Sequence, residues 1–326
     1  MKEKILAFLR NRDGFVSGQT ICEELGVSRT AIWKYINVLR EEGYEIESVT
    51  RKGYRLLQSP DVVTREELLG YLPAHVLAGE IRYYNTVDST NEAAKRAASA
   101  GISAESIFIA DRQTSGKGRR GRVWSSPGGE DVFFSILLRP DLSPEAAPLL
   151  TLVAALAAVE TAGKHSGEAC QIKWPNDIVL HDKKICGILT EMSVEMDEID
   201  CVVVGVGFNL NRLQFDSEIE DMAGSIRKET GKRIIRAAFL ADFIQIFMDK
   251  YHRFLEEESF SMFVEAYNDH LINKGRQVRL VRRGQELLRT ALGINEKGEL
   301  ILEDENGTIE TVLSGEVSVR GLYGYV

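Results

Sequence analysis

The first sixty residues show helical spacing of apolar positions, followed by strand-like alternation. Ile32, Ile36 and Leu39 recur at intervals of four and three, which places them on one buried helix face. Ser17 and Ser28 precede two such segments and are expected to cap helices there. The predicted elements are helices over 4–10, 18–25 and 29–41, then a hairpin of strands over 44–49 and 54–56. This order indicates a separate winged helix-turn-helix module.

The middle of the chain combines short apolar runs with helical segments. An alanine-rich helix is expected to begin at Pro144 and to end near Ala162. Ser89 and Glu92 have the spacing of a capping box at the start of another helix, which runs to about Ala100. The predicted strands cover 81–84, 107–110, 131–138, 171–172, 185–189 and 201–205, with further helices over 64–71 and 237–258. This mixture predicts a mixed sheet covered by helices.

After Gly275 the pattern changes to short strands joined by tight turns, of which Asn306-Gly307 is the clearest. The predicted strands are 278–281, 287–294, 300–302 and 308–313. They indicate a small β-barrel of about fifty residues. Residues 314–320 either close that barrel or reach back to the central sheet. We therefore expect an α+β multidomain protein with domains at 1–60, 61–272 and 273–326.

A basic loop rich in glycine, Gly116–Trp124, follows the apolar run Ile107–Ala110. Glycine lets the backbone approach a ligand closely, and Lys and Arg bind carboxylates or phosphates. Its Gly-x-Gly-x-x-Gly pattern is not a dinucleotide fingerprint, because that fingerprint opens a helix and Pro127 follows here. The His-Arg-Asp and Asp-Phe-Gly motifs of kinases are missing. We interpret the loop as an anion site, with a solvated basic turn as the alternative.

A second turn displays Lys173, Asn176 and Asp177, because Pro175 interrupts regular structure there. Lys184 lies beside a predicted hairpin tip a few residues later. Cations from two turns can hold two anions close together, and a carboxylate can hold Mg²⁺. A carboxylate that attacks an α-phosphate needs such a site, since the two reactants repel each other.

The distribution of charge and the spacing of the cysteines bear on the partners and the cellular compartment of the protein. The net charge is −9, but the first 60 residues carry 10 Lys and Arg against 8 Asp and Glu, and the remaining 266 carry 30 against 41. The four cysteines are far apart, which favours a reducing compartment without a disulfide framework or zinc site. We find neither a signal peptide nor an apolar run that could span a bilayer, so we expect a cytoplasmic protein.

The third predicted helix has a long polar and partly basic face, as a recognition helix in the DNA major groove would have. Cations at the tip of the hairpin could contact phosphates. The candidate DNA-binding residues are Ser28, Arg29, Thr30, Trp33, Lys34, Asn37, Arg51 and Lys52. A small helical module that contacts another protein is the alternative, because many winged helices bind no nucleic acid.

Four separate motifs resemble those of the biotin–protein ligases, in the bifunctional bacterial form that also represses the biotin operon. They are Asp88–Asn91, Gly116–Gly121, Lys173–Asp177 and Lys184–Ile188, in the family's order. The similarity covers essentially the whole chain. The chain departs from the family at Lys117, where Arg is usual; Lys keeps the charge but lacks the planar fork. The resemblance implies a class II synthetase-like central domain and an SH3-like C-terminal barrel.

The resemblance implies that biotin and MgATP form biotinyl-5'-AMP, which is also the corepressor. Biotin then passes to a lysine of the biotin carboxyl carrier protein of acetyl-CoA carboxylase. It also implies that the adenylate orders the loops, promotes homodimerisation and licenses operator binding. Implied biotin-binding residues are Ser89, Thr90, Asn91, Gln113, Lys117, Gly118, Arg119, Lys184 and Gly187. Implied nucleotide-binding residues are Arg122, Trp124, Lys173, Asn176, Asp177, Asn209 and Arg320. Implied catalytic residues are Lys184, Arg119 and Asp177, with Asp177 as the candidate Mg²⁺ ligand.

Two rival functions remain open. A lipoate–protein ligase would share a related fold, but it does not explain the Gly-Lys-Gly-Arg-Arg-Gly loop or the winged helix. A ligand-sensing transcription factor without enzymatic activity does not need the combination of Asp177 and Lys184.

Overall fold

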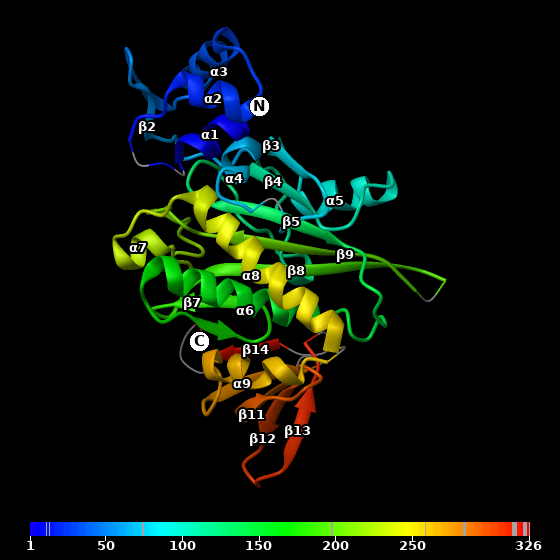
Figure 1. Cartoon of the computed structure of the whole chain (residues 1–326). Helices are drawn as coiled ribbons and strands as arrows, with labels where there is room; N and C mark the ends of the chain where they lie inside the picture. Colours follow the sequence, from blue (N-terminus) through cyan, green and yellow to red (C-terminus); the bar gives the residue numbers. More distant parts are fainter. Residues whose placement is uncertain are drawn as a thin grey trace.

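The computed structural model describes residues 1–10, 12, 14–73, 75–196, 198–257, 259–282, 285–314, 318–321 and 325, and for 318–321 it describes the backbone only. Three parts follow one another along the chain (Figure 1). They are an N-terminal group of helices with a hairpin, a central sheet with helices, and a C-terminal antiparallel sheet.

The N-terminal part has the predicted winged helix-turn-helix order. Its elements are α1 (Lys2–Arg10), α2 (Gly18–Leu25), α3 (Arg29–Glu41), β1 (Glu45–Val49) and β2 (Gly53–Gln58). Ser17 and Ser28 cap α2 and α3 as expected, because their hydroxyls accept from Thr20 N and Ala31 N. Gly26 ends α2 with a φ of 65°, a conformation that costs glycine little. Ile32, Ile36 and Leu39 lie in the core.

The central sheet has seven strands in the order β3-β4-β5-β9-β8-β7-β6. Their bounds are β3 (Ile81–Val87), β4 (Ser106–Gln113), β5 (Val132–Leu138), β6 (Gln171–Lys173), β7 (Asp177–Leu180), β8 (Lys183–Glu195) and β9 (Glu198–Phe208). Only the β3–β4 pair is parallel among the described pairs, so the sheet is mixed, as predicted. Beyond Gly187, β8 pairs with β9 alone among the described strands, which leaves an open edge.

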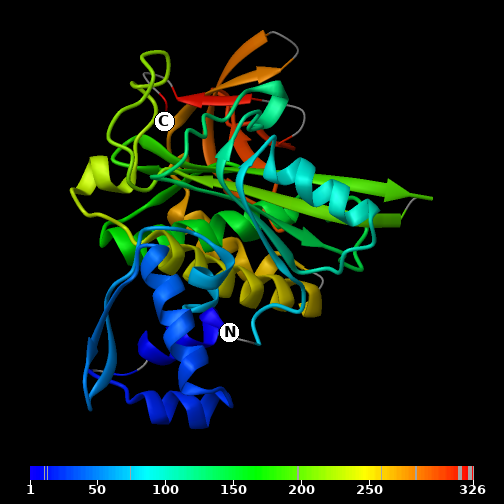
Figure 2. The same ribbon diagram turned by 90° about the horizontal axis from the view of Figure 1, so that it is seen from above.

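Helices cover both faces of this sheet. Figure 2 shows α5 (Thr90–Ser99) on one face, with α6 (Leu149–Ser166) and α8 (Arg236–Glu257) on the other. The main core lies between the sheet and α6 and α8, where Phe208, Phe239 and Phe243 make edge-on ring contacts. Smaller helices are α4 (Arg65–Leu69), α7 (Ile226–Thr230) and α9 (Ser261–His270), and Arg119–Gly121 form one 3₁₀ turn. The sequence did not predict α7 or α9.

Two local predictions were wrong. The alanine-rich helix begins at Leu149 rather than Pro144, because Pro148 has no N–H and its ring would clash with the carbonyl of residue 144 in a continuing helix. Ser89 makes no capping hydrogen bond to α5. Instead, Gln113 Oε1 accepts from Thr90 N at 2.8 Å, and Glu92 pairs with Lys95 and Lys117.

The C-terminal part is a five-stranded antiparallel sheet in the order β13-β12-β11-β10-β14. Its strands are β10 (Gln277–Arg282), β11 (Gln285–Ile294), β12 (Leu300–Glu303), β13 (Ile309–Val312) and β14 (Ser318–Gly321). Because β14 pairs with β10, residues 318–321 extend this sheet instead of joining the central one. The sheet packs against the turn at residues 173–177, where Trp174 Nε1 donates to Gly298 O at 3.1 Å.

Candidate active site

Three glycines on β8 and β9 form a floor on the α5 face of the sheet. Trp124, from the basic loop, lies on this floor: a Cβ added to Gly187 would lie 2.8 Å from the indole ring, and one added to Gly207 would lie 2.5 Å from Nε1. At Gly205 an added Cβ would lie 2.0 Å from Asn91 Oδ1. Side chains at these positions would therefore exclude the groups that now lie there. The buried Nε1 of Trp124 has no hydrogen-bond partner among the described residues.

The predicted cations and carboxylate converge beside this floor. Lys184 Nζ lies 2.6 Å from Asp177 Oδ1 and 5.2 Å from the centre of the Trp124 ring. Asp177 Oδ1 is buried and accepts no hydrogen bond of good geometry from the residues that the structure describes, although its ion-pair contact with Lys184 is short. The strands explain the approach, because Asp177 begins β7 and Lys184 lies near the start of β8, and β7 and β8 pair with each other.

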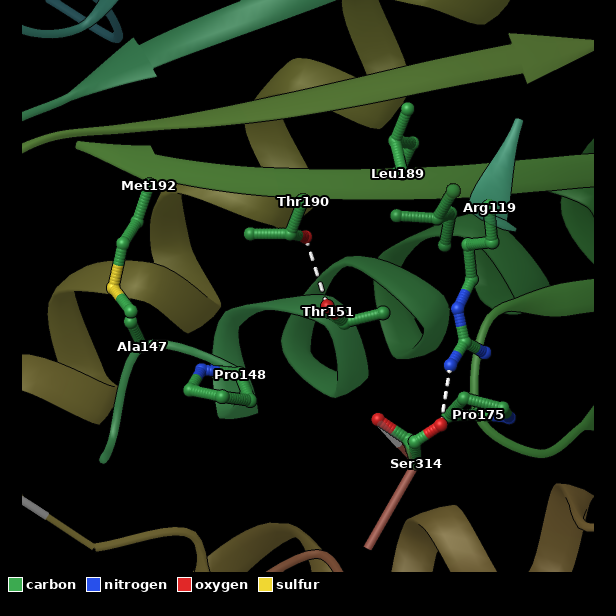
Figure 3. Close-up of a pocket in the computed structure, with 10 residues that line it drawn as sticks. Arg119, Ala147, Pro148, Thr151, Pro175, Leu189, Thr190, Met192 and Ser314 are labelled. Carbon is green, nitrogen blue, oxygen red and sulfur yellow. Dashed lines mark hydrogen bonds between the residues drawn. The ribbon is translucent and has the colours of Figure 1, made fainter. Parts of the chain in front are cut away.

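Arg119 connects the basic loop to the turn that holds Asp177. Its guanidinium donates to Asn176 Oδ1 at 2.8 Å and to Ser314 O at 2.6 Å. Burial lowers the pKa of Arg119 from its usual value, and the nearby Asp177 carboxylate opposes this shift. The same guanidinium lines a cavity of about 240 Å³ at the open edge of β8 (Figure 3). Thr151 and Thr190 meet on the wall of this cavity, with their hydroxyl oxygens 2.8 Å apart.

The loop itself is tightly folded. Trp124 N donates to Gly116 O at 2.9 Å, and Gly118 N donates to Arg122 O at 2.7 Å. Lys117 points toward α5 and pairs with Glu92 at 2.6 Å. The pKa of Glu92 is lowered mainly by its hydrogen bond from Lys117, and to a smaller extent by the one from Lys95. The loop is therefore attached to the helix whose start carries Thr90 and Asn91.

A polar socket surrounds the start of α5, where Ser89, Thr90 and Asn91 are buried. Gln113, at the end of β4, accepts from Thr90 and donates to Ser126 Oγ at 2.9 Å. The structure thus brings together the socket, the glycine floor and the group of Lys184, Arg119 and Asp177.

Other predicted residues lie apart from this group. Asn209 is buried and donates to Gly224 O at 3.0 Å, so it holds the following loop. Arg122 is exposed. The side chain of Arg320, and all of Glu316, lie outside the described residues.

Sequence reasoning missed two residues of the site, Tyr325 and Ser135. The hydroxyl of Tyr325, near the C-terminus, donates to Asp177 Oδ2, and Lys173 Nζ lies 3.6 Å from the centre of the Tyr325 ring. Burial raises the pKa of Tyr325, and the Asp177 carboxylate adds to this effect. Ser135 lies below the socket, and its only sequence signal was a single hydroxyl in an apolar strand. No sequence pattern pointed to Tyr325, because it lies about 150 residues from Asp177.

Two buried arginines fasten the surrounding loops. Arg212 Nε donates to Asp131 Oδ2 at 2.7 Å. Burial raises the pKa of Asp131, and the Arg212 charge opposes that shift. Arg236 contacts Asp111 at 3.0 Å and Asp61, in the segment after the hairpin, at 3.1 Å. The segment that follows the winged helix is therefore tied to the central sheet.

The predicted DNA face is exposed. On α3, Arg29, Thr30, Lys34 and Trp33 face solvent, and Trp33 is 59% exposed. Ser28 is exposed while its hydroxyl caps α3, and Asn37 is partly buried. Arg51 and Lys52 lie exposed at the tip of the β1–β2 hairpin. The helix face and the hairpin tip are thus both available to a partner.

Comparisons with known proteins agree with this architecture. Residues 83–209 match the Biotin/lipoate A/B protein ligase family, residues 2–55 match an HTH domain, and residues 275–320 match the Biotin protein ligase C terminal domain. The solved biotin protein ligase from Aquifex aeolicus in complex with biotin and ATP is similar, with a TM-score of 0.66 and 31% identity. The match covers 74% of this chain and 99% of that one. Fold and site thus define a ligase of the biotin/lipoate class with an added HTH domain.

Two curated relatives match nearly the full length. The bifunctional ligase/repressor BirA of Bacillus subtilis is 36% identical over 320 residues, which cover 98% of each chain. That of Escherichia coli is 31% identical over 319 residues, which cover 97% of this chain and 96% of that protein. The chain belongs to the bifunctional ligase/repressor family.

Proposed function

We propose that this protein is an ATP-dependent biotin–protein ligase that also represses biotin synthesis genes. The observation that carries the proposal is the convergence of Lys184, Arg119 and Asp177 beside the glycine floor and the polar socket. This geometry suits a reaction in which two anions must meet. The relatives named for biotin ligation support the choice of biotin as the substrate.

In the first step, a biotin carboxylate oxygen attacks the α-phosphorus of ATP, and pyrophosphate leaves with the electrons of the broken P–O bond. Lys184 holds the carboxylate and stabilises the charge that develops on the acyl phosphate. Arg119 holds the opposite side of the same group. In the second step, a neutral lysine amine of the carrier protein attacks the acyl carbon; AMP leaves and one proton is released.

The remaining residues bind the two substrates. Ser89, Thr90, Asn91, Gln113, Lys117, Gly118 and Gly187 surround biotin. Arg122, Trp124, Lys173, Asn176, Asn209 and Arg320 serve the nucleotide. The buried Nε1 of Trp124, which has no hydrogen-bond partner in the described part of the chain, would gain one from the bound ligand. The proposed domains are 1–60, 61–272 and 273–326.

Asp177 is the residue that would hold the Mg²⁺ of MgATP. Within the described residues its buried Oδ1 accepts no well-aligned hydrogen bond and is paired with the Lys184 ammonium, so this oxygen already faces a cation and fits a metal ligand. No three His, Cys, Asp or Glu side chains in the described part of the chain form a metal site. Phosphate and water would therefore supply the other oxygen ligands, as Mg²⁺ prefers. The ion would neutralise phosphate charge.

The repressor activity would use α3 and the hairpin. Arg29, Lys34, Arg51 and Lys52 would contact operator DNA, with biotinyl-5'-AMP as the corepressor.

The open edge of β8 supports both a homodimer and docking of the carrier protein, because an unpaired edge can accept a strand from another chain. All four cysteines are free, which agrees with a reducing cytoplasm. Over the part of the chain that the structure describes, we find no helix suited to crossing a membrane.

Biotin-dependent exchange between ATP and labelled pyrophosphate tests the enzymatic proposal. We expect exchange with biotin and none with lipoate. Exchange with lipoate alone would assign the site to the rival ligase, and binding without any exchange would favour a sensing repressor.

A further inference from the structure

A hydrogen-bond network lies beneath the socket, and it includes Ser135 and Glu191, which have no role in the mechanism above. Ser135 is fully buried in β5. Its Oγ lies 2.6 Å from Asn91 Oδ1 and 2.7 Å from Thr90 Oγ1, so its one proton is shared between these two acceptors. Gly205 pairs with Ser135 across the β5–β9 ladder and leaves the space that the Asn91 amide fills.

The orientation of the Asn91 amide is fixed by two groups that can only accept. Nδ2 donates to Leu189 O at 3.3 Å and to Glu191 Oε2 at 2.8 Å. Glu191 Oε1 is also paired with Lys95 Nζ at 2.6 Å. A reversed amide would place its oxygen against a carbonyl and a carboxylate. Asn91 Oδ1 therefore faces Ser135, and the hydroxyl proton of Ser135 points between Asn91 Oδ1 and Thr90 Oγ1.

The orientation of Gln113 is fixed from the other side. Its Oε1 accepts from the backbone N–H of Thr90 at 2.8 Å, and a backbone N–H can only donate. The Thr90 hydroxyl donates to the same oxygen at 3.3 Å. Gln113 Nε2 donates to Ser126, whose hydroxyl donates to Trp124 O at 3.3 Å. The Thr90 proton is thus used within the protein, and Thr90 Oγ1 has a lone pair left for a ligand.

We propose that Ser135 and Glu191 are positioning residues that set the direction of this network, so that Thr90 accepts a hydrogen bond from a ligand N–H. The inference rests on the proposed function, in which Thr90 is one of the residues that surround biotin. The ring urea of biotin has two N–H groups, whereas the dithiolane of lipoate has none. A ligand that presents an acceptor at this point would meet a lone pair and bind more weakly. The network therefore selects for cyclic ureas.

The test compares biotin with the two cyclic carbamates in which one ureido N–H is replaced by oxygen. Pyrophosphate exchange is measured for the wild type, Thr90→Val, Ser135→Ala and the double variant. Ser106→Ala is the matched control, because Ser106 is also a buried serine in the same sheet, with both hydrogen bonds away from the site. Thermal unfolding of each variant shows whether it is folded.

We expect Ser135→Ala to raise the KM for biotin roughly tenfold, the loss of about one hydrogen bond, with kcat almost unchanged. Its preference for biotin over the disfavoured carbamate should fall by a similar factor, because Thr90 Oγ1 loses the Ser135 donor that helps to keep its own proton directed at Gln113. The double variant should be no worse than Thr90→Val, since Ser135 acts through Thr90. Ser106→Ala should keep both values.

Undiminished preference for biotin in Ser135→Ala, or losses that multiply in the double variant, would overturn the inference. If Ser135→Ala does not fold, Glu191→Gln replaces it, because Glu191 is 28% exposed and a Gln there can donate and let the Asn91 amide reverse. Wild-type preference in that variant would also contradict the inference. A wild-type protein without biotin-dependent exchange would overturn the proposed function itself, whereas exchange with unaltered preference overturns only the role of the network.

Discussion

Replacing Lys184 by alanine tests the cation that is expected to stabilise the acyl phosphate. The Lys184 backbone is held by two hydrogen bonds that the substitution keeps, from its N to Met222 O at 2.8 Å and from Gly224 N to its O at 3.0 Å. The side chain is 25% exposed and its ion pair with Asp177 faces the site. We therefore expect the variant to fold with nearly unchanged thermal stability.

The magnitude follows from charge in a partly screened site. Two unit charges 4 Å apart attract by about 4 kcal/mol at an effective dielectric constant of 20, which is an upper bound for a partly exposed pair. Loss of one group that stabilises developing oxyanion charge typically costs about 3 to 4 kcal/mol. We expect about 3 kcal/mol, which lowers the rate of biotinyl-AMP formation roughly a hundredfold or more.

The assay is pyrophosphate exchange at saturating biotin and MgATP. Lys183→Ala is the matched control, since Lys183 precedes Lys184 and contacts Asp221 O at 2.7 Å outside the site. Lys184→Arg should recover part of the rate because it keeps the charge. A Lys184→Ala rate within threefold of the wild type, or an equal loss in Lys183→Ala, would refute the role assigned to Lys184.

Three further predictions concern other parts of the molecule. Arg29→Ala and Lys34→Ala should abolish the gel shift of operator DNA and keep biotin transfer, because both side chains lie on the exposed face of α3; loss of both activities together would contradict this separation. Arg212→Ala should destabilise the protein by about 3 kcal/mol in denaturant unfolding, because it leaves the buried Asp131 carboxylate without its partner; an unchanged midpoint would count against the pair. Asp88 should titrate at a pKa of about 2, since hydrogen bonds from Arg96 favour its carboxylate. Its lowered pKa adds stability above about pH 4 that is lost as the pH falls toward 2, and this is less than about 1 kcal/mol at such an exposed pair. NMR titration of Arg96→Ala should return that pKa toward 3.8, and no change would refute the assignment.

Local features of the fold were predictable where a residue acts on its own neighbours. Ser17, Ser28 and Gly26 determine the helix ends of the N-terminal part through short-range hydrogen bonds and a left-handed turn. The start of α6 was misplaced because the sequence pattern ignored what Pro148 does to a preceding turn. The helix α7 was missed because it is too short to show periodicity.

The residues of the candidate site that lie in short sequence motifs could be predicted from the sequence. Spacing indicated that Arg119, Asp177 and Lys184 serve one chemistry, and the structure brings these side chains close together. Long-range partners could not be inferred, because they depend on which strands lie side by side. The contact of Ser135 with Asn91 and that of Tyr325 with Asp177 are of this kind. Ser89 was misread as a cap because the competing acceptor, Gln113, lies on another strand.

The central claim is that cations and a carboxylate from separate turns join two anions, biotin and ATP, and pass the product to a carrier lysine. The most direct measurement is the intact mass of a biotin carboxyl carrier domain after incubation with the protein, biotin and MgATP. The account predicts one added biotinyl group, which depends on both ATP and Lys184. An unmodified carrier domain, with the protein folded and biotin present, would contradict it.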